Sequence, residues 1–302
     1  MIKTKSSVPA ADALMKPAIL AARGCIQQLG IQPDRCEVLQ DAHTIVVRLT
    51  DTLVARIVTD TEGPRQGTTW FSRETALAAH LTRHQAPVIP LHPDIPPIAH
   101  MHDGFAMNFW HFVTATDASP SPRDIGASMH HCHQVLQTLD EPLPTLAILH
   151  ESLTILQQQT VQDSLPQDSI DLLARHLHAS IEMLTSCPQQ ALHGDAHMGN
   201  LLMTTQGLLW TDWEDAFAGP VEWDLASVIW NAKLLENDHA TVNAIVQAYE
   251  SCGTVIDHQT LDQCLIARAA VMSAWYPILY PNPSPERLQK LRQRLAWLRS
   301  MP

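Results

Sequence analysis

The stretch "HGDAHMGNLLMTTQGLLWTDWED", residues 193–215, joins a polar loop to a hairpin. The loop places two histidines, a carboxylate and a carboxamide in one short segment, and the runs after it read as two strands closing around Gln206-Gly207. A hairpin returns its end close to its beginning, so Asp212 should lie near Asn200. Their oxygens suit a hard divalent cation such as Mg²⁺, which leaves Asp195 free to take a proton.

The composition of the whole chain predicts a globular protein of more than one small core. The chain has 302 residues, of which 45% are hydrophobic. No apolar run approaches the roughly 18 residues that span a bilayer, and Lys16 and Arg23 interrupt the N-terminal stretch, which we expect to form an amphipathic helix.

Charge and cysteine usage narrow the class of protein further. The formal net charge is −12 and no Lys/Arg-rich run is present, so we expect neither a nucleic-acid nor a membrane partner. The six cysteines are scattered without a CxxC pair. This pattern favours reduced thiols and a cytoplasmic location.

Residues 1–115 carry most of the strand signals. Runs of β-branched residues between 36 and 58 predict strands, and a helix is expected at about 69–84. Another pair of strand-like runs brackets Gly104 and ends in "FAMNFWHFV". We therefore expect a β-rich N-terminal domain consisting of a small sheet with one or two helices.

Residues 116–302 are predicted to form a mostly helical C-terminal domain. One helix should begin at Ser121, because Pro122 suits the first helical position and Asp124 completes a capping-box pattern. Its buried stripe is expected to comprise Ile125, Met129, Cys132, Leu136 and Leu139. The two domains together predict an α+β fold with a boundary near residues 113–120.

Two charged residues of the N-terminal domain lie on apolar faces of their elements. Glu74 shares a face of its helix with Phe71, and a carboxylate in such a stripe is costly unless it is paired. Arg56 alternates with Val54 in the strand "TLVARIV", so it is a charge on a largely apolar side. We expect Arg56 and Glu74 to pair, with Arg48 on the preceding strand as a competing cation.

These groups resemble the phosphoryl-transfer machinery of kinases. The spacing H-x-D-x-x-x-x-N, followed by an aspartate after a hairpin, is present in the quoted stretch, and "WTDWEDAFAGPVEWDLA" (210–226) and "IGASMHHCH" (125–133) match motifs of one family in form. The chain most resembles the aminoglycoside phosphotransferase and choline kinase family, over roughly residues 36–280 and most strongly in 191–226. The resemblance implies a two-lobed, protein-kinase-like fold.

The resemblance also implies the reaction and the residues at its centre. The chain would be an ATP-dependent kinase acting on a hydroxyl of a small molecule. Asp195 would be the catalytic base or would orient the acceptor hydroxyl, and His193 and Asp224 would brace its loop. Asn200 and Asp212 would hold Mg²⁺.

The nucleotide side of the resemblance rests on the N-terminal domain. Glu74 would pair with the cation of the third strand, and a hinge in "MNFWHFV" would meet adenine through its backbone at Trp110, His111 and Phe112.

Two features depart from the family pattern. The strand cation is often lysine, whereas this chain offers Arg56, whose planar fork is not a simple replacement. The run "LQDAHTIVV" contains no glycine, so the usual glycine-rich phosphate cover is absent.

The other chemistries that the sequence could support are less well matched. A metal-dependent phosphohydrolase would need a Gly-Asn-His motif, a protein kinase would need an activation loop, and a nucleotide-binding pseudoenzyme would lack part of the catalytic set. Clusters of histidines suggest zinc binding as another alternative, but no Cys–His spacing fits a structural zinc site. The clusters are His100/His102, His130/His131/His133 and His193/His197.

The charges near Asp212 bear on the acceptor. The acidic balance and three carboxylates near Asp212, namely Glu214, Asp215 and Glu222, favour a cationic amino alcohol or an aminoglycoside-like compound. A neutral or zwitterionic metabolite, such as a sugar or a homoserine-like compound, is the alternative.

Overall fold

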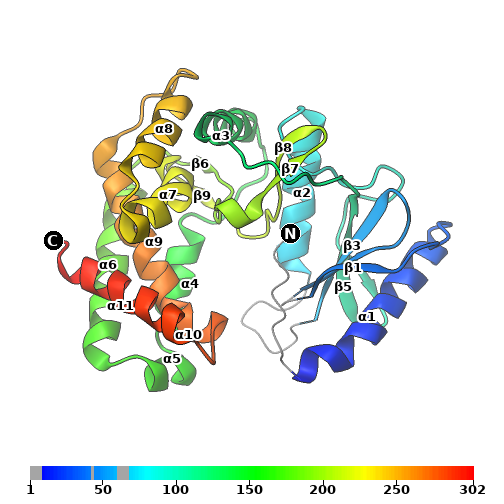
Figure 1. Cartoon of the computed structure of the whole chain (residues 1–302), viewed down its shortest axis with the longest axis horizontal. Coiled ribbons are helices and arrows are strands. Elements are labelled where there is room, and N and C mark those ends of the chain that lie inside the picture. Colours follow the sequence, from blue (N-terminus) through cyan, green and yellow to red (C-terminus); the bar gives the residue numbers. More distant parts are fainter. Residues whose placement is uncertain (1–8, 42–43, 60–67) are drawn as a thin grey trace. The chain divides into compact units, whose positions relative to one another are not determined.

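The computed structural model of the chain describes residues 9–41, 44–59 and 68–302, and it divides into two compact units (Figure 1). The first unit comprises residues 1–119 together with 201–214, and the second comprises 120–200 and 215–302. Parts of the expected N-terminal helix (1–8) and of the glycine-free run (42–43) lie outside the described residues. No helix in the described part is long and apolar enough to cross a membrane.

The first unit is built around a five-stranded antiparallel sheet in the order β1-β2-β3-β5-β4. Its elements are α1 (Pro9–Gln28), β1 (Glu37–Asp41), β2 (Thr44–Arg48), β3 (Leu53–Val58), α2 (Thr69–Arg83), β4 (His100–His102) and β5 (Phe105–His111). The strands and the helix expected from the sequence are present with bounds shifted by one or two residues.

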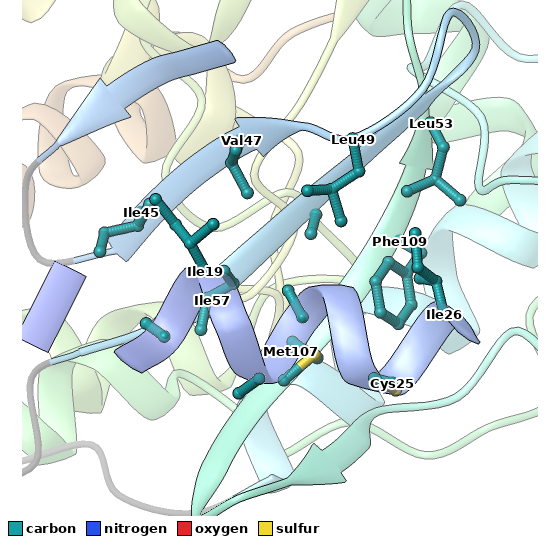
Figure 2. Packing of buried hydrophobic residues seen from close by; sticks show 14 of the residues in the cluster. Ile19, Cys25, Ile26, Ile45, Val47, Leu49, Leu53, Ile57, Met107 and Phe109 are labelled. Carbon is teal, nitrogen blue, oxygen red and sulfur yellow. The ribbon is translucent and has the colours of Figure 1, made fainter. Parts of the chain in front are cut away.

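Helix α1 covers one face of this sheet, where the main apolar core of the unit lies (Figure 2). Because side chains alternate along a strand, β3 sends Leu53 and Ile57 to this core together with Ile45 of β2. Ile26 of α1 packs among them and is fully buried. On the other side of β3, Val54 packs with Ala78 of α2 and Trp110 of β5. Arg56 therefore points to the α2 side, as its alternation with Val54 predicts.

The hairpin β7 (Leu201–Thr204) and β8 (Gly207–Trp210) belongs to the first unit, although its position in the sequence places it in the predicted C-terminal domain. The reason is main-chain hydrogen bonding: Trp210 exchanges bonds with Pro87 and Ile89, and Met203 O accepts from Thr116 N. Thr204 pairs with Gly207, so the turn residues are Thr205 and Gln206, one position before the predicted Gln206-Gly207.

The second unit is helical apart from two short strands, β6 and β9, that pair with each other. Its elements are α3 (Pro122–Leu136), α4 (Ala147–Ile155), α5 (Gln159–Ser164), α6 (Gln167–Thr185), β6 (Gln190–Ala191), the 3₁₀ turn η1 (Met198–Asn200), β9 (Ala218–Gly219), α7 (Glu222–Asn231), the π-helical segment η2 (Ala232–Glu236), α8 (His239–Glu250), α9 (His258–Ala274), α10 (Tyr276–Leu279) and α11 (Pro285–Arg299).

Helix α3 begins as its sequence predicts. The Ser121 side chain accepts from Asp124 N, and the Asp124 carboxylate accepts from Ser121 N, which completes the capping box. Four of the five residues in the expected stripe are buried. Leu139 is the exception, because the helix ends at Leu136 and Leu139 lies beyond it, half-buried.

Helix α9 is the centre of the second unit and contacts α4, α6, α7, α10 and α11. Surrounded in this way, it is apolar on nearly all sides. Arg268 is a charge in the middle of this buried helix, so its charge must be matched by groups inside the unit.

We expect the α1 face of the sheet to dominate the stability of the first unit. Changing Ile26 to Ala should lower the free energy of unfolding by about 2–5 kcal/mol, because it leaves a cavity in the core. Leu20 lies on the same helix but is 66% exposed. Leu20→Ala should therefore change the free energy by no more than about 0.5 kcal/mol. Urea unfolding of the two variants tests this, and equal losses would contradict it.

Candidate functional site

The loop of residues 193–200 is held by one buried carboxylate, Asp224, near the start of α7. Asp224 is completely buried and accepts hydrogen bonds from His193 N at 2.7 Å and from Gly194 N at 3.0 Å. The Trp223 indole donates to Gly194 O at 2.7 Å. These bonds satisfy main-chain groups that a buried loop could not leave unpaired. The expected bracing by Asp224 is confirmed, whereas the part of Trp223 was not predicted.

A chain of side chains continues from Asp224 into α3 and α8. His133 Nε2 lies 3.0 Å from the Asp224 carboxylate, and His133 Nδ1 lies 2.7 Å from the Tyr249 hydroxyl. Because the carboxylate can only accept, a neutral His133 carries its hydrogen on Nε2 and accepts the Tyr249 proton at Nδ1. All three side chains are buried, so His133 and Tyr249 hold the Asp224 carboxylate in a fixed orientation.

Gly194 is required by the geometry of this loop. Its φ of +84° lies in the left-handed region, which side chains other than glycine rarely adopt. A Cβ at this position would lie 2.0 Å from Asp215 O. The loop passes too close to the chain after the hairpin to accommodate any side chain here.

Asp195 follows this fixed turn and has two basic side chains as neighbours. Its carboxylate forms an ion pair with Arg268 of α9 and lies 3.3 Å from His197 Nε2. Burial alone would raise the pKa of Asp195, but Arg268 and His197 outweigh it and hold that pKa well below its usual range. The Asp195 side chain remains 27% exposed, so a ligand can reach it.

Arg268 is a site residue that the sequence argument missed. The signal was available, because "LDQCLIARAAVMSAWY" is an apolar helix interrupted by one arginine. The reasoning that drew attention to Glu74, that a charge in a buried stripe needs a partner, applies equally to Arg268.

Arg56 lies at the centre of an ion-pair network in the first unit. Its Nη1 donates to both oxygens of Glu74 at 2.9 and 2.8 Å, so the expected pairing is present. Its Nη2 lies 2.9 Å from both Asp212 and Glu214. Burial disfavours the charged guanidinium, yet these three carboxylates together raise the pKa of Arg56 above its usual value.

Glu74 is almost fully buried, with 1% exposure, and needs more than one partner. Asn108 of β5 donates to Glu74 Oε2 at 2.6 Å, and the Trp110 indole donates to Asn108 Oδ1 at 2.8 Å. The competing cation Arg48 is committed elsewhere, since it donates to the carbonyls of Thr50 and Asp51. Within the described residues, Arg56 is therefore the cation of this network.

The two candidate Mg²⁺ ligands flank the hairpin in the chain and belong to different units. In the first unit, Asp212 adopts a left-handed φ of +68°, and its buried Oδ1 is an ion-pair partner of Arg56 without a well-directed hydrogen bond among the described residues. In the second unit, Asn200 is buried and uses its Nδ2 to donate to Asp195 O at 3.0 Å. Both offer the hard oxygen ligands that Mg²⁺ prefers.

No group of three or more His, Cys, Asp or Glu side chains is placed to hold a metal ion among the residues that the structure describes. A Mg²⁺ ion that takes one or two protein ligands does not need such a group, because phosphates and water complete its coordination. Asn200 and Asp212 each carry a side-chain oxygen of the kind that Mg²⁺ prefers.

The expected adenine-binding segment lies at the end of β5. The Trp110 ring is buried and packs against α2, so it is part of the core. The backbone N–H groups of His111 and Phe112 already donate to Pro90 O at 2.9 Å and Thr52 O at 2.6 Å. A base that binds here would therefore have to use other backbone groups of the segment.

Two of the three carboxylates that favoured a cationic acceptor are engaged within the protein. Glu214 pairs with Arg56, and the buried Glu222 accepts from Asp257 N at 3.1 Å. The negative field expected from these acids is reduced accordingly.

Comparison with known proteins identifies what this arrangement is similar to. Residues 36–263 match the sequence profile described as the phosphotransferase enzyme family. No curated protein matches the chain. Among solved structures, amicoumacin kinase in complex with AMP-PNP and Ca²⁺ superposes with a TM-score of 0.70 at 14% identity, covering 92% of this chain and 94% of that one.

Two further structures show the same fold. A microcompartment-associated aminopropanol kinase has a TM-score of 0.66 at 16% identity, covering 91% of this chain and 94% of that one. The choline kinase from Streptococcus pneumoniae has a TM-score of 0.62 at 15% identity, covering 91% and 98%. These likenesses confirm the expected α+β, kinase-like fold.

We expect Asp224 to be a major contributor to the stability of the second unit. Asp224→Asn keeps the shape but turns an N–H₂ group toward a main-chain N–H, which can only donate, so the free energy of unfolding should fall by roughly 1.5–3 kcal/mol. The exposed Asp262 pairs with Lys233 on the surface, and Asp262→Asn should cost no more than about 1 kcal/mol. Urea unfolding followed by circular dichroism compares them. A loss for Asp262→Asn as large as that for Asp224→Asn would contradict the assignment.

Proposed function

The chain belongs to the phosphotransferase enzyme family, and on that premise we propose that it is an ATP- and Mg²⁺-dependent kinase of a small hydroxyl compound. The observation that carries the proposal is the position of Asp195. Its loop is fixed by the buried Asp224 and His133, while its own carboxylate stays partly exposed. A rigid loop that presents one accessible carboxylate suits the positioning of an acceptor hydroxyl.

In the proposed reaction, the acceptor oxygen forms a bond to the γ-phosphorus of ATP as the bond to the β–γ bridging oxygen breaks and ADP leaves. The Asp195 carboxylate would accept a hydrogen bond from the hydroxyl and receive its proton as the new bond forms. Because Arg268 and His197 lower the pKa of Asp195, it is a weak base before the acceptor binds. Orientation of the hydroxyl is therefore its main contribution in this proposal.

Asn200 and Asp212 would hold Mg²⁺ through their side-chain oxygens. When bound, Mg²⁺ neutralises charge on the phosphate oxygens. Asp212 is paired with Arg56, which keeps the carboxylate in place. His193 would act through the loop, since its main chain is tied to Asp224.

Arg56 and Glu74 would act on the nucleotide phosphates. Glu74 fixes one edge of the Arg56 guanidinium with two bonds, which leaves Nη2 on the side of Asp212 and Glu214. An arginine held in this way can neutralise phosphate charge without losing its orientation. Trp110, His111 and Phe112 would contribute the segment that meets adenine.

The acceptor is proposed as a small molecule bearing a hydroxyl group. Similar structures include kinases named for amicoumacin, aminopropanol and choline. The sequence-based preference for a cationic acceptor loses support, because Glu214 and Glu222 are engaged within the protein. The neutral or zwitterionic alternative gains weight from the same observation.

We expect Asp195→Asn to remain folded and to bind ATP, but to turn over at least about 100-fold more slowly, because the amide cannot accept the proton. The assay is ADP release in the presence of Mg²⁺ against a panel of amino alcohols, sugars, hydroxy acids and antibiotics. The matched control is the exposed Asp163→Asn on α5. Near-normal turnover by Asp195→Asn would remove Asp195 from the mechanism, and no ADP release by the wild type with any acceptor would count against the proposed function.

Replacing the two proposed metal ligands should affect Mg²⁺-dependent activity to different degrees. Asp212→Ala should abolish activity at all Mg²⁺ concentrations, whereas Asn200→Ala should raise the Mg²⁺ concentration needed for half-maximal rate, because a carboxylate contributes more to a hard cation than a carboxamide. Titrating Mg²⁺ for both variants measures this. Curves like that of the wild type for both would place the ion elsewhere.

A further inference from the structure

Two buried arginines of the second unit have more positive charge and more hydrogen-bond donors than their surroundings satisfy. Arg268 on α9 is 3% exposed and Arg294 on α11 is 7% exposed. The Nε of Arg268 and the Nε and Nη1 of Arg294 have no hydrogen-bond partner within the part of the chain that the structure describes. The Tyr276 hydroxyl of α10 lacks one there as well. Buried donors of this kind are rarely left without an acceptor in a native protein.

The helices that carry these groups pack together, because α9 contacts both α10 and α11 (Figure 1). The Arg294 guanidinium lies 4.6 Å from the centre of the Trp230 ring, which fixes it from one side. Burial lowers the pKa of Arg294 to about 10; Tyr280 and Tyr276 oppose this change, and the charge of Arg268 adds to it. The positive charge of Arg268 therefore acts on Arg294 in the same direction as burial.

The only carboxylate that forms an ion pair with either arginine among the described residues is Asp195, which pairs with Arg268. Of the two buried guanidinium groups, that of Arg268 thus has a carboxylate partner among the described residues, and that of Arg294 has none there. A buried cation is stable only when it is paired and hydrogen-bonded, so these two arginines lack one negative charge. The planar fork of a guanidinium matches a carboxylate or a phosphate group, which would satisfy the missing acceptors.

We propose that Arg268, Arg294 and Tyr276 form an anion site beside Asp195, and that the acceptor is a small hydroxyl compound that also bears a carboxylate or phosphate group. This inference rests on the proposed function for the placement of the hydroxyl at Asp195. The anionic group would bind Arg294, Tyr276 and the free Nε edge of Arg268, while Nη2 of Arg268 keeps its bond to Asp195. A purely cationic acceptor would meet two like charges here.

The binding test uses the full-length protein without nucleotide. Thermal unfolding is followed with glycerate, glyceramide, inorganic phosphate and choline as probes at equal ionic strength. We expect glycerate or phosphate to raise the Tm of the wild type, and glyceramide and choline not to. Arg294→Met, which retains an apolar side chain of similar length, should weaken the binding of that anion at least about tenfold. Arg294→Lys should restore part of it, because it keeps the charge but not the fork.

The matched control is Arg292→Met, which removes the same charge from an exposed position on the same helix and should respond like the wild type. A second readout does not need a ligand. If Arg294 is an unpaired buried cation, Arg294→Met should have a Tm equal to or above that of the wild type without any probe. A lower Tm for Arg294→Met together with unchanged anion binding would assign it a structural role and overturn the proposal. So would the absence of any anion response in the wild type.

Turnover then separates this inference from the proposed function. With ATP and Mg²⁺, hydroxy acids and sugar phosphates should be phosphorylated in preference to their amides and parent sugars, and Arg294→Met should raise KM more than it lowers kcat. Comparing hydroxy acids with sugar phosphates shows whether the site prefers a carboxylate or a phosphate group. ADP release only with neutral or cationic acceptors would overturn the anion site and leave the kinase assignment intact. An anion response that depends on Arg294, without ADP release from any acceptor, would uphold the site and contradict the kinase.

Discussion

The buried carboxylate of Asp224 is the interaction on which the candidate active site depends. A loop that turns sharply at Gly194 exposes main-chain N–H groups inside the second unit, where water cannot satisfy them. Asp224 accepts from two of these groups and is itself held by His133, which ties it to Tyr249 on another helix. The position of Asp195 is thus set by packed helices, so the loop holds this carboxylate with the precision of a helix.

The first unit also contains a buried charge that needs partners, but this charge is positive. Arg56 is a cation on an apolar side of the sheet, and it is stable there because Glu74 from α2 and two acids after β8 surround it. Glu74 is in turn bonded by Asn108. In both units, one buried charge joins elements far apart in the sequence. Such networks are costly when partly satisfied, so each fixes the geometry of its neighbours.

The sequence predicted the parts of this structure that depend on local pattern. The capping box at Ser121, the pairing of Arg56 with Glu74 and the bracing by Asp224 all follow from spacing, alternation or motif. Arg268 could have been singled out as a charge in an apolar helix, but its partner could not, because Asp195 lies 73 residues away and no local pattern marks a contact of that range. The sequence also did not show that the hairpin belongs to the first unit, since this depends on main-chain hydrogen bonds to residues 87–89 and 114–116. Leu139 shows that a helical period alone does not locate the end of a helix.

The overall charge was a poor guide to the acceptor for a physical reason. A net charge of −12 describes the whole surface, and most of its field is screened by salt within about 10 Å. A bound molecule responds instead to the few charges that it touches, which are desolvated and act at short range. At Asp195, the charge in direct contact is the guanidinium group of Arg268, which is positive. The sign of the net charge therefore does not predict the sign of the charge at Asp195, which follows from the pairing of individual buried groups.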